Sequence, residues 1–279
     1  MTDLAGAYSR LSANVRGALW MLASALTFTL MTSLIKYLGD GYSPALQTFY
    51  RQAAGLLVLA PIILRNPKAA FKASRPGILW FRSLAGALGM ILAFWAYQEL
   101  PLAEANALSF TRTLWIVPLA IFVLHEKIGV WRMSATFIGF AGVLVMLQPS
   151  IANAVGWPAA AALGSALLFA MTVTGVKILT RDHTTTALLV WAAVLGFVLS
   201  VPLAVLEWRW PSPVDLLLLS LMGVLGLATQ LCYIRGMALG EAAAMAPIDY
   251  TRLIFAVLMG LVLFNEVPNL VTMAGAAIV

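Results

Sequence analysis

Long apolar runs follow one another along nearly the whole chain, and each is ended by Gly, Pro or charged residues. A helix needs about 20 apolar residues to cross the ~30 Å hydrocarbon core of a bilayer. The pattern therefore predicts an all-α integral membrane protein with ten transmembrane helices. They are expected at residues 17–37, 44–64, 77–99, 102–124, 131–148, 157–178, 185–206, 213–235, 241–264 and 268–279. The last run is short, and we expect the native chain to continue beyond Val279.

Composition agrees with the pattern, because 62% of the residues are hydrophobic, 10% are charged, and the mean hydropathy is +0.94. These values lie outside the globular range. The polar start, residues 1–14, has no apolar region of the kind that a cleaved signal peptide needs. The single cysteine, Cys232, lies in an apolar segment, where we expect a small buried hydrophobe and no internal disulfide.

The net charge of +6 comes from basic residues that lie between the apolar runs, so it predicts membrane orientation and no nucleic-acid binding. If the N-terminus is cytoplasmic, twelve Lys and Arg residues fall on the cytoplasmic side, and three, Lys36, Arg51 and Arg209, fall on the other. We therefore expect a multi-pass protein of a bacterial-type inner membrane with both termini in the cytoplasm. Lipid is an expected partner, and the chain is expected to be a monomer.

The two parts of the chain resemble each other, which predicts an internal repeat. Matching positions recur about 140 residues apart: Ser24–Phe28 with Ser165–Phe169, Lys36 with Lys177, Arg112 with Arg252, and Glu126 with Glu266. The expected units are residues 1–150 and 151–279, each with five helices. An odd number of spans per unit places the second unit upside down in the membrane, as in many secondary transporters.

Two arginines are expected in the middle of spans, Arg112 in the fourth and Arg252 in the ninth. A charge at that depth costs at least about 2.5 kcal/mol on insertion scales, so it should face protein or a wet cavity. Helical spacing places Asn106, Ser109 and Trp115 on the same side as Arg112. This side of the fourth helix is therefore a candidate lining for a substrate cavity.

The ninth span also carries Asp249 and Tyr250 close to Arg252, and three interpretations of these charges remain open. Asp249 can hold an arginine in a structural ion pair. Alternatively, an arginine faces the cavity and binds a substrate carboxylate. In the third interpretation, Asp249 titrates as a proton relay.

Aromatic and amide side chains extend the candidate site, although each aromatic alone is also explained by core packing or an interfacial belt. Gln98 and Gln230 can bind a polar group or join helices by hydrogen bonds. The complete candidate set for substrate binding is Trp20, Phe28, Phe94, Tyr97, Gln98, Asn106, Ser109, Arg112, Trp115, Phe169, Gln230, Tyr233, Asp249, Tyr250 and Arg252.

Other positions have structural interpretations. The segment Gly223–Gly226 has glycine at both ends, which favours close approach of helices. Glu126 and Glu266 end their helices, where the helix dipole disfavours a carboxylate. We expect each glutamate to cap or pair with a neighbouring basic or amide group.

Several segments resemble the drug/metabolite transporter superfamily of EamA type. They are Pro247–Ala256 and Phe264–Pro268, which are similar to the second repeat of bacterial members, and His125–Lys127 and Gly139–Gly142, which are similar to the first. The resemblance implies ten helices in two inverted halves around a central cavity that is lined mainly by helices one, three, four, six, eight and nine. Within the superfamily, the chain most resembles YddG-type exporters of aromatic and other neutral amino acids.

The expected function is therefore a carrier that exports small amphipathic metabolites, amino acids first, by alternating access. The alternative is a carrier for uptake or exchange of a larger metabolite, such as S-adenosylmethionine or riboflavin. A channel is a further alternative. No enzyme activity, metal or cofactor is expected, because both histidines, His125 and His183, lie at span ends and no nucleophile–base set lies within a span.

Overall fold

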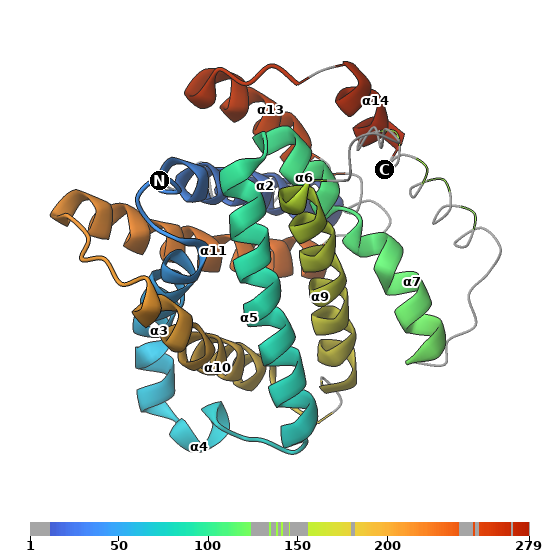
Figure 1. The fold of residues 1–279 in the computed structure, drawn as a ribbon. Helices are drawn as coiled ribbons and strands as arrows, with labels where there is room; N and C mark the ends of the chain where they lie inside the picture. Colours follow the sequence, from blue (N-terminus) through green and yellow to red (C-terminus); the bar gives the residue numbers. More distant parts are fainter. Residues whose placement is uncertain are drawn as a thin grey trace.

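The structure is a computed structural model that describes residues 12–123, 156–179, 182–239, 251–268 and 270–278, together with Ser134, Ile138, Ala141, Val145 and Ile248. This part of the chain is all-helical, without strands, as expected (Figure 1). The helices are α2 (Ala13–Tyr37), α3 (Pro44–Arg65), α4 (Pro67–Ala70), α5 (Pro76–Glu99), α6 (Leu102–Ser109), α7 (Arg112–Phe122), α9 (Trp157–Leu179), α10 (Thr185–Leu206), α11 (Pro213–Leu239), α13 (Thr251–Phe264) and α14 (Leu270–Ile278).

Seven expected spans correspond to single helices with ends that differ by a few residues: α2, α3, α5, α9, α10, α11 and α14. Five of the described helices are long and apolar enough to cross a membrane: α2, α5, α9, α10 and α11. The fifth expected span, residues 131–148, lies almost wholly outside the described residues. The ninth is described as helix at Ile248 and from Thr251 onward. The total of ten spans therefore stays a prediction.

Helix starts follow local sequence signals. The hydroxyl of Ser43 accepts a hydrogen bond from the amide of Leu46, and Pro44 occupies the first turn of α3. Thr184 caps α10 by accepting from the amide of Ala187 at 3.2 Å. Side-chain oxygens at these positions satisfy amides that have no partner within the helix, which fixes where the helix begins.

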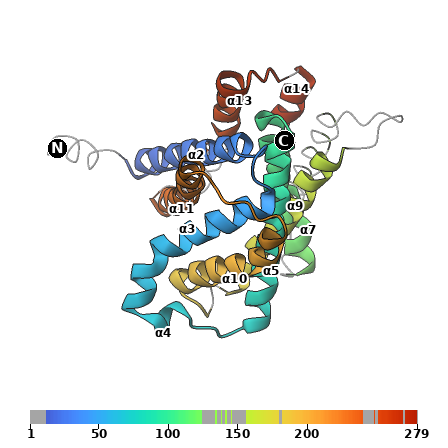
Figure 2. The same ribbon diagram turned by 60° about the vertical axis from the view of Figure 1, so that its left-hand side comes forward.

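The main helix pairs join the first half of the chain to the second. Helix α2 packs along α11, α5 along α9, and α3 along α10 (Figures 1 and 2). In the order of the expected repeat, the first helix of each half thus packs on the third helix of the other, and the two second helices pack together. This exchange is compatible with a two-fold relation between the halves, and the inverted repeat stays a prediction.

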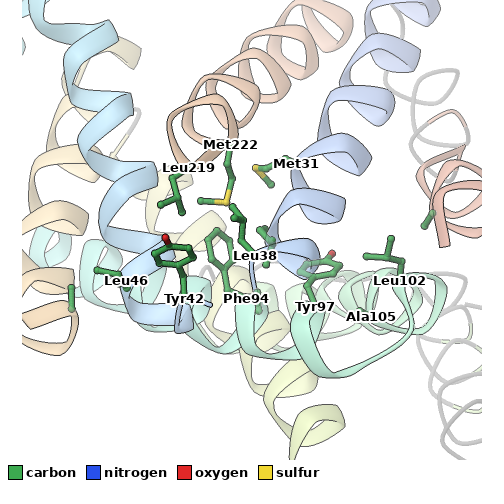
Figure 3. Close-up of a cluster of buried hydrophobic side chains, with 14 residues drawn as sticks. Met31, Leu38, Tyr42, Leu46, Phe94, Tyr97, Leu102, Ala105, Leu219 and Met222 are labelled. Carbon is green, nitrogen blue, oxygen red and sulfur yellow. The ribbon is translucent and has the colours of Figure 1, made fainter. Parts of the chain in front are cut away.

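A buried cluster fills the space where α2, α5 and α11 meet. It includes Met31 of α2, Phe94 and Tyr97 of α5, and Leu219 and Met222 of α11. Figure 3 shows Leu219 and Met222 above Tyr42 and Phe94. The cluster anchors the face of α5 that carries the cavity described below.

An ion pair links the two halves at the end of α2. The Nζ atom of Lys36 lies 2.5 Å from Oε1 of Glu266 and donates to the carbonyl of Leu100 at 2.6 Å. The other carboxylate oxygen, Oε2, accepts from the amide of Leu102 at 2.9 Å, at the start of α6. The prediction that Glu266 pairs with basic and amide groups is confirmed. Glu126 lies outside the described residues.

Backbone geometry brings Glu266 to this position. Asn265, directly after α13, has a φ of 53°, the left-handed conformation that commonly ends helices. The amide of Glu266 then donates back to the carbonyl of Gly260 at 2.9 Å. A side chain at residue 260 would begin 3.1 Å from Oε2 of Glu266, so glycine leaves room for the carboxylate.

Glycine also permits the contact of α11 with α3. A Cβ added to Gly223 would lie 2.5 Å from the Cβ of Ala54 and 2.9 Å from the carbonyl oxygen of Arg51, and neither atom belongs to a flexible side-chain end. Close approach at this glycine motif, expected from the sequence, is confirmed.

We predict that Gly223→Ala destabilises the protein by about 1–3 kcal/mol, because α11 must move away from α3. Gly55→Ala is the matched control, since an added Cβ there meets no atom within 4 Å. The stability of the Gly55→Ala variant should be unchanged or slightly higher, because alanine has a higher helix propensity than glycine. The measurement is the thermal unfolding midpoint of both variants in detergent. Equal midpoints would contradict the predicted overpacking.

Candidate functional site

A cavity of about 380 Å³ lies in the helix bundle and is lined by residues of α2, α3, α5, α6, α7, α9, α10, α11 and α13. Its longest wall is one face of α5, where the lining residues recur every three or four positions: Arg82, Gly86, Met90, Phe94 and Tyr97. At ~1.5 Å per residue, this stripe extends over roughly 22 Å. The cavity is therefore long enough for an extended ligand.

The expected fourth span is not one continuous helix. It breaks at Phe110 and Thr111, between α6 and α7. The hydroxyls of Ser109 and Thr111 each donate to a carbonyl three residues back, at 2.6 Å, and such bonds compete with the helical ladder. The break places Ser109 and Arg112 on the cavity, the location at which irregular backbone is tolerated inside a membrane protein.

The end of the cavity beside α13 is aromatic and cationic. The ring of Phe28 lies edge-on to that of Tyr97, with centroids 6.3 Å apart. The guanidinium of Arg252 lies 4.6 Å from the Phe28 centroid, at cation–π distance. Arg252 is buried, so the prediction that this arginine faces the protein interior is confirmed.

The structure brings together eight of the fifteen candidate residues. Those that line the cavity are Phe28, Phe94, Tyr97, Ser109, Arg112, Phe169, Gln230 and Arg252. Asp249 and Tyr250 lie outside the described residues. The other five do not line the cavity, and their positions correct the sequence-based expectation.

Two corrections concern residues of the fourth span. Asn106 is fully buried and donates its amide to the carbonyl of Leu102 at 2.8 Å. Trp115, on α7 like Arg112, is 36% exposed and does not line the cavity. The break at Phe110 separates Asn106 and Ser109 on α6 from Arg112 and Trp115 on α7, so the four residues do not lie on one continuous helix.

Three corrections come from contacts between elements. Gln98 donates to the carbonyl of Tyr42 at 3.2 Å, so this amide joins α5 to the turn between α2 and α3. The ring of Trp20 lies 4.9 Å from the guanidinium carbon of Arg235, at a helix contact. Tyr233 lies on α11 outside the cavity lining. Amphipathicity is weak on these apolar helices, so the sequence could not distinguish the cavity side from the packing side.

Sequence reasoning missed polar residues that line the other part of the cavity, mainly Arg51, Gln52, Arg82 and Thr172. Arg51 was expected at a membrane surface, but it lies in the third turn of α3 and contacts Met90. Arg82 was expected at the cytoplasmic edge, but it is only 8% exposed. One feature of the sequence could have indicated that Arg51 and Arg82 lie inside the helix bundle. Each lies more than one turn beyond the proline at which its helix begins, Pro44 of α3 and Pro76 of α5.

No group of three His, Cys, Asp or Glu side chains that could hold a metal occurs among the described residues. The cavity therefore offers arginine, amide and hydroxyl donors together with flat aromatic faces. This combination suits a ligand that has a ring system and oxygen acceptors.

Comparisons with known proteins agree with the fold and its membrane setting. The model of the EamA-like transporter family matches residues 15–148 and 156–279. One crystal structure is similar over 95% of this chain and 94% of its own, with a TM-score of 0.66 and 19% identity, which shows the fold alone.

Curated relatives of similar length are named as transporters. The S-adenosylmethionine uptake transporter of Rickettsia prowazekii is 28% identical over 268 residues, which cover 95% of this chain and 90% of the relative. The riboflavin transporter of Rhizobium johnstonii is 29% identical over 95% of this chain and 88% of its own. The riboflavin transporter of Vibrio cholerae is 26% identical over 95% and 90%, respectively.

Proposed function

Because the chain belongs to the EamA-like transporter family, we propose that this multi-pass membrane transporter is a carrier for a ring-bearing metabolite of the size of S-adenosylmethionine or riboflavin. The observation that carries the proposal is the long cavity with aromatic faces and polar donors along α5. A volume of about 380 Å³ lies in the range of sites for drug-sized ligands.

The expected export of amino acids receives no support from the named relatives, which transport S-adenosylmethionine or riboflavin. The resemblance to amino-acid exporters was based on motifs that the whole superfamily shares, and these motifs determine the fold rather than the cargo. The alternative, a carrier for a larger metabolite, is therefore favoured. These relatives are named as transporters, which is consistent with the expectation that the chain is not an enzyme.

The transport cycle is part of the proposal. Two inverted halves, residues 1–150 and 151–279, would expose one central site to each side of the membrane in turn. The exchanged helix pairs, α2 with α11 and α5 with α9, and the two ranges matched by the family model support this division. Both termini are proposed to be cytoplasmic on the basis of the basic residues between the spans.

Uptake into liposomes tests the cargo. Purified protein is reconstituted, and the entry of labelled riboflavin, S-adenosylmethionine and tryptophan is followed in preloaded and empty vesicles. We expect saturable counterflow of riboflavin or S-adenosylmethionine that exceeds any counterflow of tryptophan. Counterflow of tryptophan alone would overturn the proposal and restore amino-acid transport.

A substitution on the cavity wall tests the aromatic contact. Phe169 is partly exposed on the cavity, and we predict that Phe169→Leu weakens binding of the transported ring compound by roughly two- to tenfold through loss of a stacking face. Phe122→Leu is the control, because Phe122 is 76% exposed and does not line the cavity. Isothermal titration in detergent measures both affinities. Equal losses in the two variants would argue against a stacking role.

A further inference from the structure

Arg51 extends from α3 toward α5 and α11. Its Nη1 atom lies 3.0 Å from Sδ of Met90 and 3.3 Å from Oε1 of Gln52, and both partners are neutral. Its Nε atom is buried without a hydrogen-bond partner. Among the described residues, no acidic side chain pairs with this guanidinium.

A glycine in α11 leaves room for the Arg51 guanidinium at this position. A Cβ added to Gly226 would lie 2.8 Å from Nε and 2.9 Å from Nη2 of Arg51, so any side chain at residue 226 would displace the guanidinium. Gly223, one turn earlier, permits the backbone approach of α3 already described. The two glycines of this motif thus position a charged group as well as pack two helices.

Arg82 lies farther along the same cavity, near the start of α5. It is 8% exposed, its Nη1 atom donates to the carbonyl of Leu188 at 3.3 Å, and its Nε atom is buried without a partner. Met90, which contacts Arg51, follows Arg82 by eight residues on α5, a rise of roughly 12 Å. Two guanidinium groups that contact only neutral atoms therefore lie along one wall.

The described residues that line the cavity include four arginines and no aspartate, glutamate or lysine. Arg112 and Arg252 make further interactions, so the charge argument depends on Arg51 and Arg82. Burying a cation without a counter-ion is unfavourable, and a cavity that concentrates one sign of charge attracts ions of the other. A bound anion would compensate this charge.

We propose that the Arg51 and Arg82 side chains form an anion-binding subsite, so that among ring-bearing compounds the cavity favours cargo with a carboxylate or phosphate group. Guanidinium groups match both anions geometrically through paired N–H donors. The inference deepens the proposed function, because it depends on the same cavity being the transport site.

Pairs of similar compounds that differ in charge test the subsite. Riboflavin and riboflavin 5′-phosphate differ by a phosphate, and S-adenosylmethionine and S-adenosylhomocysteine differ by a sulfonium charge. In proteoliposomes the less positive member of each pair should compete better for transport, by roughly ten- to a hundredfold. Arg51→Gln should remove this preference, Arg51→Lys should retain part of it, and Gly226→Ala should reduce it with the charge count unchanged.

Arg65→Gln is the control, because Arg65 is also on α3 but is exposed at its end. It removes the same charge outside the cavity and should leave the preference intact. If Arg51→Gln and Arg65→Gln behave alike while transport continues, the subsite is overturned and the proposed function stands.

Thiol labelling tests the cavity charge without any cargo. Thr172→Cys and Ser109→Cys, each in a Cys232→Ala background, place one thiol at either end of the cavity. We expect an anionic methanethiosulfonate reagent to react faster than a cationic one, relative to free thiol, and Arg51→Gln to reduce this ratio at least about threefold. A ratio that is unchanged by Arg51→Gln overturns the subsite. A ratio that responds supports the subsite whatever the outcome of the cargo transport assay, so the two proposals can fail separately.

Discussion

Removal of the Lys36 charge is expected to destabilise the protein by roughly 3–5 kcal/mol, because Lys36→Met leaves the Glu266 carboxylate buried without its cation. Both side chains are mostly enclosed, with exposed fractions of 14% and 19%, so solvent screens the pair weakly. The carboxylate would keep only its bond from the amide of Leu102. The unfolding midpoint in detergent and the yield of monodisperse protein measure the effect.

The double variant Lys36→Met with Glu266→Gln separates an uncompensated charge from lost packing. It should be more stable than Lys36→Met alone, because no buried charge remains and the side-chain carbonyl oxygen that Glu266→Gln retains can still accept from the amide of Leu102. Exchange of the two charges should not restore stability, since a lysine side chain in place of Glu266 has no acceptor for that amide. A double variant no more stable than the single one would show that the ion pair is not the stabilising contact.

We expect the ion pair of Lys36 and Glu266 to affect transport as well as stability, because of its location. It joins the end of α2, the loop before α6 and the loop after α13, so it ties the two halves together. If the two halves are inverted copies, as proposed, their relative movement requires such contacts to form and break. Under the proposed cycle, Lys36→Met should therefore impair counterflow even at temperatures at which the variant remains folded.

The sequence predicted the helices well where the signals were local. Ser43 with Pro44 at the start of α3 and Thr184 at the start of α10 are capping signals, and the expected ends there agree with the structure. Asn265, with its left-handed backbone, ends α13 one residue before Glu266. Local backbone chemistry depends little on the remainder of the fold, so it can be deduced from the sequence.

The lining of the cavity was predicted only in part, because it depends on which side of each helix meets its neighbours. Phe28 and Phe169, at matching positions in the two halves, were both expected there and both line it. Asn106 and Ser109 were aligned with Arg112 and Trp115 on the assumption of one regular helix, but the break at Phe110 divides the four residues between α6 and α7. Arg51 was assigned to a membrane surface, because proximity to a helix start does not reveal that a glycine-lined groove in α11 receives it.

Loss of the Arg252 guanidinium is expected to have the largest effect on transport. We predict that Arg252→Gln reduces affinity for the transported cargo by at least about a hundredfold, since two charge-assisted hydrogen bonds to an acceptor would be lost. Arg252→Lys should recover little, because a lysine cannot place a flat guanidinium over the Phe28 ring. Equilibrium binding of labelled cargo measures both, and Lys72→Gln, at an exposed position, is the charge control.

The same variant distinguishes the interpretations that the sequence left open for Asp249. If Arg252 serves only as the structural partner of Asp249, Arg252→Gln leaves a buried carboxylate uncompensated, and a second substitution, Asp249→Asn, should restore both stability and transport. If Arg252 binds cargo, Asp249→Asn can restore stability but not affinity, because the guanidinium is still absent. We expect the second pattern, since Arg252 lines the cavity beside Phe28 and Tyr97. Full recovery of transport in the double variant would remove Arg252 from the binding site.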